Sequence, residues 1–392
     1  MKIQKYIILI FIFFPFFVKA DVFNNWYLSN NFFFKEKKKS KIDLELLWTK
    51  KIGHGKYIFT QLEPAYKKGL LYVTDTWGSV YCIDIYTGEI IWNINLIKKF
   101  CFFHCDSKYL FSGPVISDNY LYLSSEKGIV FALNIKNGNK IWEKNVFGEI
   151  LSKPIIKNNI LLIYNMNDIL QALNKYNGKI LWTINLGITN KLNFRGSSSP
   201  VIFFNNVILG GNNGIVSSRI INNGMLVWET NLTKFNSKSD FLQINDIDIQ
   251  PLIYNGIVYA SSYNGSFVAI DLSNGNIIWE KIYFTHKNFI INNNIIYLID
   301  TDNNIYTLNT KNGNIIWIQK EFKKYDINNL LFYKAKIYFT DNKGFIYWIN
   351  AKTGKFIGKQ RISKKNIHKL LLIKNMIVIQ NIYGKIYVLT IK

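Results

Sequence analysis

Hydrophobic and polar positions alternate along this chain in a unit that returns about every 40 to 50 residues. In its clearest copy, residues 131–142 (FALNIKNGNKIW), a short alternating run, an Asn-Gly pair and a second run ending in Trp follow one another. Alternation with a period of two predicts β-strands, and Asn-Gly predicts a tight turn between them. Further copies are residues 81–92, 171–182, 224–228, 271–279, 309–317 and 347–358, the last without its Trp. Multi-stranded repeats of this length predict a β-propeller, an all-β fold.

The third strand of each repeat gives the number of blades. These strands are expected to begin near Gly78, Gly128, Asp168, Gly214, Gly265, Asn304, Gly344 and Gly384. We therefore expect eight blades of four strands within residues 42–392. The segment around Trp48 resembles a fourth strand without its first three, whereas residues 370–389 offer three strands without a fourth. Because an open ring would leave strand edges exposed, the N-terminal strand is predicted to complete the last blade.

The repeated residues have structural explanations. A large flat side chain on each outer strand can fill the wedge between neighbouring blades, while Gly and Asn or Asp suit the turn. The predicted wedge residues are Trp48, Trp92, Trp142, Trp182, Trp228, Trp279 and Trp317. Proline is tolerated at the start of a strand, where its missing N–H is not needed. Each of Pro64, Pro114, Pro154, Pro200 and Pro251 is therefore expected to open the first strand of a blade.

The N-terminus is typical of a signal peptide. Lys2 and Lys5 precede an apolar run at residues 7–18, and Ala20 offers a small-residue cleavage site. Residues 1–20 are thus predicted to direct export, and residues 21–41 to form a linker that contains the Lys-rich run 35–41. No later segment has the length and apolarity of a transmembrane helix.

Charge and cysteine content add little specific chemistry. The chain of 392 residues has 48 Lys and Arg against 25 Asp and Glu, a formal net charge of +23. Such an excess suits nucleic acid or an anionic membrane. However, the lysines are scattered through turns and accompany abundant Ile, Asn, Tyr and Phe, which favours a compositional bias, and an exported protein rarely meets nucleic acid. Steep salt-dependent binding to anionic vesicles would be needed to support the membrane reading.

The three cysteines are Cys82, Cys101 and Cys105, and an odd number argues against a disulfide framework. Cys101, His104 and Cys105 have the side chains of a metal site, but no second cluster completes four ligands. A loop with incidental cysteines, or one local disulfide, is favoured, and no metal is predicted.

Two long connections between blades are the candidate functional segments. One follows Trp182 and contains Leu192, Phe194 and Arg195; the other follows Trp228 and contains Asp246 and Asp248. Apolar and charged groups on neighbouring long loops suit a protein partner. The alternative is that Leu192 and Phe194 cover the local core and the charges are solvated, and composition alone does not decide between the two.

Four stretches carry a resemblance to a known family: residues 195–200 (RGSSSP), 210–216 (GGNNGIV), 245–248 (NDID) and 263–271 (YNGSFVAID). With them the chain from about Leu44 to Lys392 resembles BamB, the propeller family of the outer-membrane β-barrel assembly machinery. The resemblance implies that Leu192, Phe194, Arg195, Asp246 and Asp248 contact the central barrel component, BamA. Phe194 stands where that family typically has Leu.

The implied function is a non-catalytic scaffold of the Bam complex that aids insertion of β-barrel proteins at the periplasmic face of the outer membrane. It implies no cofactor and a monomer within a hetero-complex, and it leaves open whether nascent outer-membrane proteins touch the blades. Members are usually lipoproteins with a Cys after the signal segment, where this chain has Ala20 and Asp21. We therefore expect attachment through the partner or an uncleaved N-terminus.

The competing prediction is a quinoprotein dehydrogenase that uses pyrroloquinoline quinone (PQQ), because such enzymes resemble this chain in the blade motif. They also need clustered calcium ligands and, in many cases, adjacent cysteines over the quinone. This chain has no Cys-Cys pair, and turns account for most of its Asp and Asn residues. Fold alone does not confer the activity, so we expect no enzyme and no catalytic residues.

Overall fold

The computed structural model describes residues 43–53, 61–96, 110–150, 152–187, 198–232, 246–263 and 265–392. They belong to one compact unit, Ile42–Lys392. The predicted signal peptide, the linker, the pair Cys101 and Cys105, and the residues Leu192, Phe194 and Arg195 lie outside the described residues. Within these ranges the structure has no helix of the length and apolarity needed to cross a membrane.

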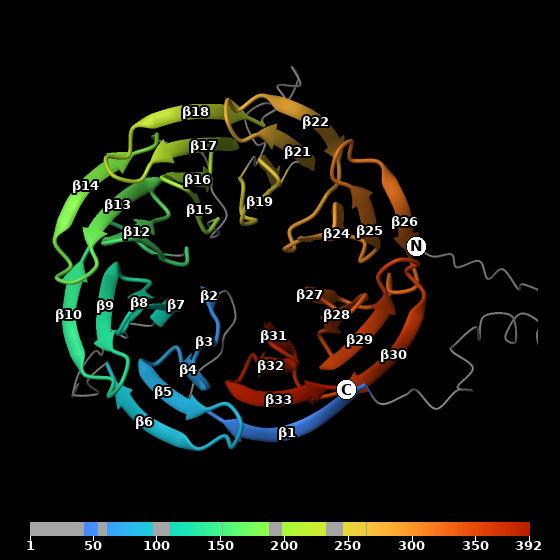
Figure 1. Cartoon of the computed structure of the whole chain (residues 1–392), viewed down its shortest axis with the longest axis horizontal. Helices are drawn as coiled ribbons and strands as arrows, with labels where there is room; N and C mark the ends of the chain where they lie inside the picture. The colour runs from blue at the N-terminus through green and yellow to red at the C-terminus, as the bar shows by residue number, and fades with distance from the viewer. Residues whose placement is uncertain are drawn as a thin grey trace, which may run out of the picture. The chain divides into compact units, whose positions relative to one another are not determined.

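The described residues form eight β-sheets that follow one another around a ring (Figure 1). Blades 1 and 2 contain β3 (Ala65–Lys67), β4 (Leu70–Thr74), β5 (Ser79–Asp84) and β6 (Ile90–Asn95), then β7 (Leu110–Ser117), β8 (Tyr120–Ser125), β9 (Ile129–Asn134) and β10 (Lys140–Asn145). Blades 3 and 4 contain β11 (Ile155–Lys157), β12 (Ile160–Tyr164), β13 (Ile169–Asn174) and β14 (Ile180–Asn185), then β15 (Val201–Phe203), β16 (Asn206–Gly210), β17 (Ile215–Ile220) and β18 (Leu226–Asn231).

The second half of the ring repeats this plan. Blades 5 and 6 contain β19 (Leu252–Tyr254), β20 (Ile257–Ser261), β21 (Ser266–Asp271) and β22 (Ile277–Ile282), then β23 (Ile290–Asn292), β24 (Ile295–Ile299), β25 (Ile305–Asn309) and β26 (Ile315–Gln319). Blades 7 and 8 contain β27 (Ile327–Tyr333), β28 (Lys336–Asp341), β29 (Phe345–Asn350) and β30 (Phe356–Arg361), then β31 (Ile367–Ile373), β32 (Met376–Asn381), β33 (Lys385–Ile391) and β1 (Leu44–Lys51). The prediction of eight four-stranded blades is confirmed, and every third strand begins one residue after its predicted position.

The last blade confirms the predicted ring closure. Its strand order is β1-β33-β32-β31, and β1 pairs antiparallel with β33 from Leu44 opposite Ile391 to Lys51 opposite Lys385. The backbone N–H of Lys392 continues the ladder to the carbonyl of Asp43 at 2.9 Å. Leu44, only 1% exposed, packs with side chains of blades 7 and 8. Burial of this strand therefore joins the two ends of the described chain.

Two details depart from the predicted plan. Four of the prolines directly precede a first strand, but Pro114 lies inside β7, where the pairing with β8 is irregular between Ser112 and Val115. That irregular pairing accommodates a residue without an N–H. In addition, the two-residue strand β2 (Gln61–Leu62) pairs in parallel with β7, so blade 2 has a fifth strand.

The hydrophobic core lies between blades. Eight clusters of buried side chains each draw on two adjacent blades, for example Tyr72 and Val80 of blade 1 with Leu121 and Leu133 of blade 2. The outer strand of every blade carries a register shift just before its fourth-strand Trp or the equivalent residue. Such bulges blunt a strand edge that would otherwise pair with other chains.

The repeated Trp residues lie between neighbouring blades. Each indole packs against the turn Gly of the next blade: a Cβ on Gly178 would lie 2.8 Å from Trp142 Cε3, and one on Gly88 would lie 2.8 Å from Trp48 Cδ2. Most also donate their Nε1–H to a backbone carbonyl of that next blade. These bonds are Trp48 to Ile85, Trp92 to Ile135, Trp142 to Lys175, Trp228 to Leu272, Trp279 to Thr310 and Trp317 to Ala351, at 2.8–3.3 Å.

Blade 7 fills its wedge differently. Gly358 stands in place of the outer-strand Trp, and Trp348 from β29 occupies the space, because a Cβ on Gly358 would lie 2.5 Å from Trp348 Cζ2. Trp348 is 1% exposed. The missing repeat residue is thus compensated by an aromatic side chain on the neighbouring strand of the same sheet.

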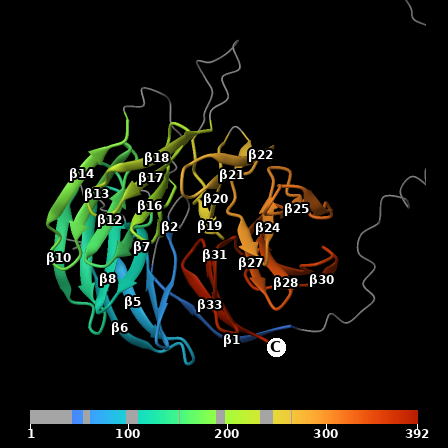
Figure 2. The ribbon, with the colours of Figure 1, turned by 45° about the horizontal axis from the view of Figure 1, so that its top comes forward.

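Antiparallel strands divide the connections between two faces of the ring. The connections from an outer strand to the next inner strand share one face with the turns between second and third strands, and we call it the loop face. The remaining turns, including those with the Asn-Gly pairs, lie on the opposite or turn face. Figure 2 shows the strands of blades 2 to 4 running between these two faces.

Candidate partner-binding site

The connection between β18 and β19 is held on the loop face by its two isoleucines. Ile247 is fully buried and fits against Gly210, where a Cβ would lie 2.4 Å from Ile247 Cγ2. Ile249 is 4% exposed, and its carbonyl accepts a hydrogen bond from Ser198 Oγ at 3.1 Å. The backbone of the segment is fixed as well, since Ile247 N donates to Gly211 O at 3.2 Å. Ile247 therefore anchors the connection between blades 4 and 5, and Ile249 anchors it between blades 5 and 6.

The two predicted acidic residues differ in environment. Asp246 is 2% exposed. Burial raises the pKa of Tyr164, and the negative charges of Asp168 and, more weakly, Asp246 add to this effect. Asp248 is partly exposed, and burial raises its carboxyl pKa. Among the described residues, no hydrogen-bond donor reaches its Oδ1. Only Asp248 therefore offers an unsatisfied acceptor near the surface.

Beneath this connection lies a second buried carboxylate. Asp168, 1% exposed, accepts hydrogen bonds from the hydroxyl of Tyr164 and, at 3.4 Å, from the N–H of Asn212. Burial raises the pKa of Asp168. Asn212 Nδ2 donates to Met166 O at 3.0 Å, which ties the loop-face turns of blades 3 and 4 together. The acidic connection thus rests on a rigid polar base.

Two exposed aromatic side chains on neighbouring segments of the loop face were missed by sequence reasoning. Tyr263, 47% exposed, lies on the turn between β20 and β21, and its N–H donates to Asp246 O at 2.9 Å. Phe284, 53% exposed, covers the same turn, because a Cβ on Gly265 would lie 2.7 Å from Phe284 Cε1. Tyr263 lies in the stretch 263–271, which the sequence indicated only as part of a family resemblance. Phe284 lies outside the repeated turn and Trp positions. We call Asp248, Tyr263 and Phe284 the aromatic–acidic patch.

The structure brings the ends of both predicted connections together. The connection that contains Leu192, Phe194 and Arg195 leaves blade 3 after Gly187 and is described again from Ser198. Ser198 is 1% exposed and bonds to Ile249 O of the second connection. The first connection runs from blade 3 to blade 4 and the second from blade 4 to blade 5. Their described ends therefore meet on the loop face.

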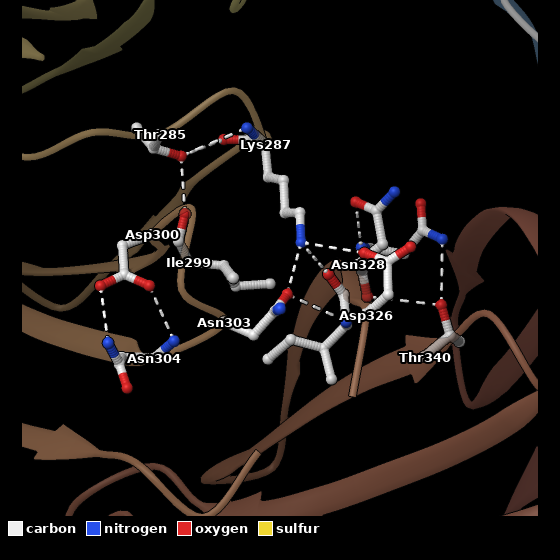
Figure 3. Close-up of polar contacts among 11 residues, drawn as sticks. Thr285, Lys287, Ile299, Asp300, Asn303, Asn304, Asp326, Asn328 and Thr340 are labelled. Atoms are coloured by element: carbon white, nitrogen blue, oxygen red, sulfur yellow. Dashed lines mark hydrogen bonds and ion pairs between the residues drawn. The ribbon is translucent and has the colours of Figure 1, made fainter. Parts of the chain in front are cut away.

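A buried lysine stiffens the connection that follows Phe284 (Figure 3). Lys287, 7% exposed, directs its Nζ to Asn303 Oδ1 and Ile327 O, each at 2.7 Å, and to Asp326 Oδ1 at 3.3 Å. Thr285 Oγ1 also donates to Ile299 O at 2.6 Å. Burial lowers the pKa of the Lys287 ammonium. All three ammonium protons have acceptors, so the segment from Phe284 to Lys287 is pinned across blades 5, 6 and 7.

The described residues offer little for catalysis or metal binding. Within these ranges no three His, Cys, Asp or Glu side chains come together as a possible metal site. Cys82 is fully buried, and burial raises its thiol pKa.

Comparison with known proteins identifies relatives. Residues 106–319 match the family model for the outer membrane protein assembly factor BamB. BamB of Escherichia coli K12 is 39% identical over 246 residues, which is 62% of each chain, so the match spans less than two thirds of that relative. The crystal structure of BamB from Moraxella catarrhalis has a TM-score of 0.77 at 19% identity, covering 88% of this chain and 99% of that one. A europium-containing methanol dehydrogenase shares the fold with a TM-score of 0.69 at 12% identity, covering 90% and 94%.

Proposed function

Because the chain belongs to the BamB family of outer membrane protein assembly factors, we propose that it is a non-catalytic scaffold for the assembly of outer-membrane β-barrel proteins. In this proposal it works within the Bam complex at the periplasmic face of the outer membrane and is held there by its partner. The closed ring supports this role, since it presents long connections from separate blades on one rigid face.

We propose that the loop face binds BamA, with the aromatic–acidic patch at the centre of the contact. The observation that carries this proposal is the Asp248 carboxylate, whose Oδ1 is buried from solvent and has no partner among the described residues, on the same loop face as exposed Tyr263 and Phe284. A buried acceptor without a donor is costly, and a cationic group of a partner would satisfy it. Exposed aromatic side chains on a rigid base are frequent anchors of protein interfaces.

The residues implied by family resemblance divide into two roles in this proposal. Leu192, Phe194, Arg195 and Asp248 would touch BamA. Asp246 is 2% exposed, so its side chain would instead position the connection by filling buried space beneath it. We therefore expect Asp246→Asn, which keeps the shape of the side chain, to weaken BamA binding less than Asp246→Ala does.

The test uses the purified full chain and the periplasmic domains of BamA in a calorimetric titration. We expect Asp248→Ala, Tyr263→Ala and Phe284→Ala each to weaken binding by about tenfold or more, the usual effect of an interface anchor. The matched control is Phe204→Ala, an aromatic residue that is 75% exposed on the turn face. Absence of binding by the unmodified chain would overturn the proposal. An equal loss of affinity in the Phe204→Ala control would refute the placement of the contact at the aromatic–acidic patch. Unchanged binding by Arg195→Ala would show that Arg195 does not contribute to the contact.

The quinoprotein alternative rests on the fold that this chain shares with the methanol dehydrogenase. A shared fold does not carry the activity, and among the described residues no three His, Cys, Asp or Glu side chains cluster as a possible metal site. No specific observation favours this alternative. Quinone-dependent dye reduction by the purified chain with calcium and PQQ would nevertheless revive it.

A further inference from the structure

A cleft lies on the loop face at the seam between blades 7 and 8, away from the aromatic–acidic patch around blade 5. Its volume is about 620 Å³, within the usual range for ligand sites. Five of its ten lining residues are cationic, and none of the ten, all of them described, is Asp or Glu. The cationic residues are Lys51, Arg361, Lys364, Lys365 and Lys385. We call this site the basic cleft.

Ring closure forces two of these charges together. Lys51 at the end of β1 stands directly opposite Lys385 at the start of β33 in the antiparallel ladder. Directly opposed side chains lie on the same face of a sheet, where like charges destabilise the pair. None of the five cationic side chains of the cleft forms an ion pair within the described part of the chain. An anion placed between them would remove the repulsion.

The turn-face end of the same seam is built differently. There Lys336 pairs with Asp43, and Lys392 pairs with Glu45 at 3.0 Å. The lysine-rich composition of the chain thus does not by itself leave cations unpaired at this seam. The all-cationic lining is particular to the loop-face end.

The base of the cleft is ordered and its cationic groups are oriented. Arg361 Nε donates to Ser363 O at 3.3 Å, and its guanidinium lies 5.5 Å from the ring centre of Phe345. Lys365 lies 5.3 Å from the ring of Tyr383, and Lys385 lies 5.2 Å from that of Tyr387. These contacts hold the heads of the side chains without neutralising them. Such preorganisation lowers the cost of binding a ligand.

The floor is a small hydrogen-bonded polar network. Ser363 and Asn381 are each 3% exposed and are joined by a hydrogen bond from Asn381 Nδ2 to Ser363 Oγ at 3.2 Å. Ser363 Oγ accepts the N–H of Lys365 at 3.0 Å, and Asn381 Oδ1 accepts the N–H of Lys385, also at 3.0 Å. The floor therefore fixes the backbone positions of two of the cationic residues.

We propose that the basic cleft binds a phosphate-bearing anion. A compact group with two or more negative charges can reach several cations at once, and an oriented guanidinium matches the geometry of phosphate oxygens. A single carboxylate supplies one charge for five cations. The phosphate can belong to a lipid headgroup or to a soluble phosphate compound, and the cleft chemistry is the same for both.

The test measures binding to the purified full chain at about 0.15 M salt, where weak long-range attraction is screened. One arm titrates pyrophosphate by calorimetry. The other measures co-sedimentation with phosphatidylcholine vesicles that contain about one third phosphatidylglycerol, an anionic lipid, against vesicles without it. Binding in the vesicle arm alone assigns the phosphate to a lipid headgroup, and binding in both arms assigns it to phosphate in general. Each of these results supports the proposal.

The deciding variant combines Lys51→Gln, Arg361→Gln and Lys385→Gln, and we expect it to weaken binding by at least about tenfold. Its matched control combines Lys311→Gln, Lys352→Gln and Lys355→Gln, which removes the same charge from exposed turn-face positions. If the triple variant does not fold, Lys51→Gln alone relieves the opposed pair and should weaken binding by about threefold. Equal losses in the variant and its control, or no binding of either phosphate probe, would overturn the proposal. Tighter binding of polyglutamate than of both probes would overturn it in favour of an acidic peptide.

Discussion

The contact between a Trp and the turn Gly of the next blade can be tested where it closes the ring. Gly88 lies on the turn between β5 and β6 with φ of +74°, and Trp48 of β1 packs directly over it. A Cβ added at Gly88 would lie 2.8 Å from Trp48 Cδ2, closer than the two carbon atoms can pack. The substitution Gly88→Ala therefore strains the backbone and pushes the indole out of the wedge.

The two costs can be separated by a second glycine. The left-handed backbone costs an Ala about 1–2 kcal/mol, and overpacking against the indole adds about 1–3 kcal/mol. Gly256 has nearly the same φ, +75°, but an added Cβ would have nothing within 4 Å. We thus expect Gly88→Ala to lower the free energy of unfolding by about 2–5 kcal/mol, and Gly256→Ala by only about 1–2 kcal/mol.

Urea denaturation of the full chain, followed by circular dichroism, measures both losses. The double variant Trp48→Ala/Gly88→Ala should cost less than the sum of its single variants, because the overlap disappears with the indole. Equal losses for Gly88→Ala and Gly256→Ala, or strict additivity in the double variant, would refute the wedge explanation of the repeat.

Two further predictions concern buried charges near the candidate site. Lys287→Met removes the ammonium donor from Ile327 O and leaves Asn303 Oδ1 with only the N–H of Ile327, so it should lower the free energy of unfolding by about 2–4 kcal/mol. Lys323→Met, at an exposed ion pair, should stay within about 0.5 kcal/mol in the same denaturation assay, and similar losses would contradict the role given to Lys287. Asp248→Asn should stabilise the free chain at pH 7 by about 1 kcal/mol, because it removes an incompletely satisfied buried charge. Burial raises the folded-state pKa of Asp248 above its unfolded value, so as the pH falls the folded chain takes up this proton first and gains stability, fully so below pH 3.8. The advantage of Asp248→Asn should therefore shrink between pH 7 and pH 3, and an advantage that does not change with pH would contradict the assignment.

The fold could be predicted because the residues that pack between neighbouring blades recur at fixed positions in the repeat. A Trp at the end of one unit meets the Gly of the next, so the local pattern already encodes the ring. Trp348 could not be predicted as a wedge residue, because its role depends on the space that Gly358 leaves on the adjacent strand. Pro114 differs because β7 begins before it and pairs irregularly with β8 at this point, which the repeat pattern does not record.

The candidate site was only partly predictable. Asp246 and Asp248 look equivalent in the sequence, yet Asp246 is buried and its charge acts on the buried Tyr164 of blade 3, whereas Asp248 is partly exposed. The exposure of Tyr263 and Phe284 follows from the packing of neighbouring turns, which no local pattern records. The basic cleft depends on ring closure, because Lys51 and Lys385 lie far apart in the sequence and meet only where β1 pairs with β33 in the last blade.

The most direct test of the proposed function is hydrogen exchange of the full chain with and without the periplasmic domains of BamA. The account predicts slower amide exchange on the loop face, at residues 246–250, 262–266 and 283–287, and unchanged exchange at the turn-face residues 203–206. Protection confined to the turn face, or no protection when the two proteins are mixed, would contradict it.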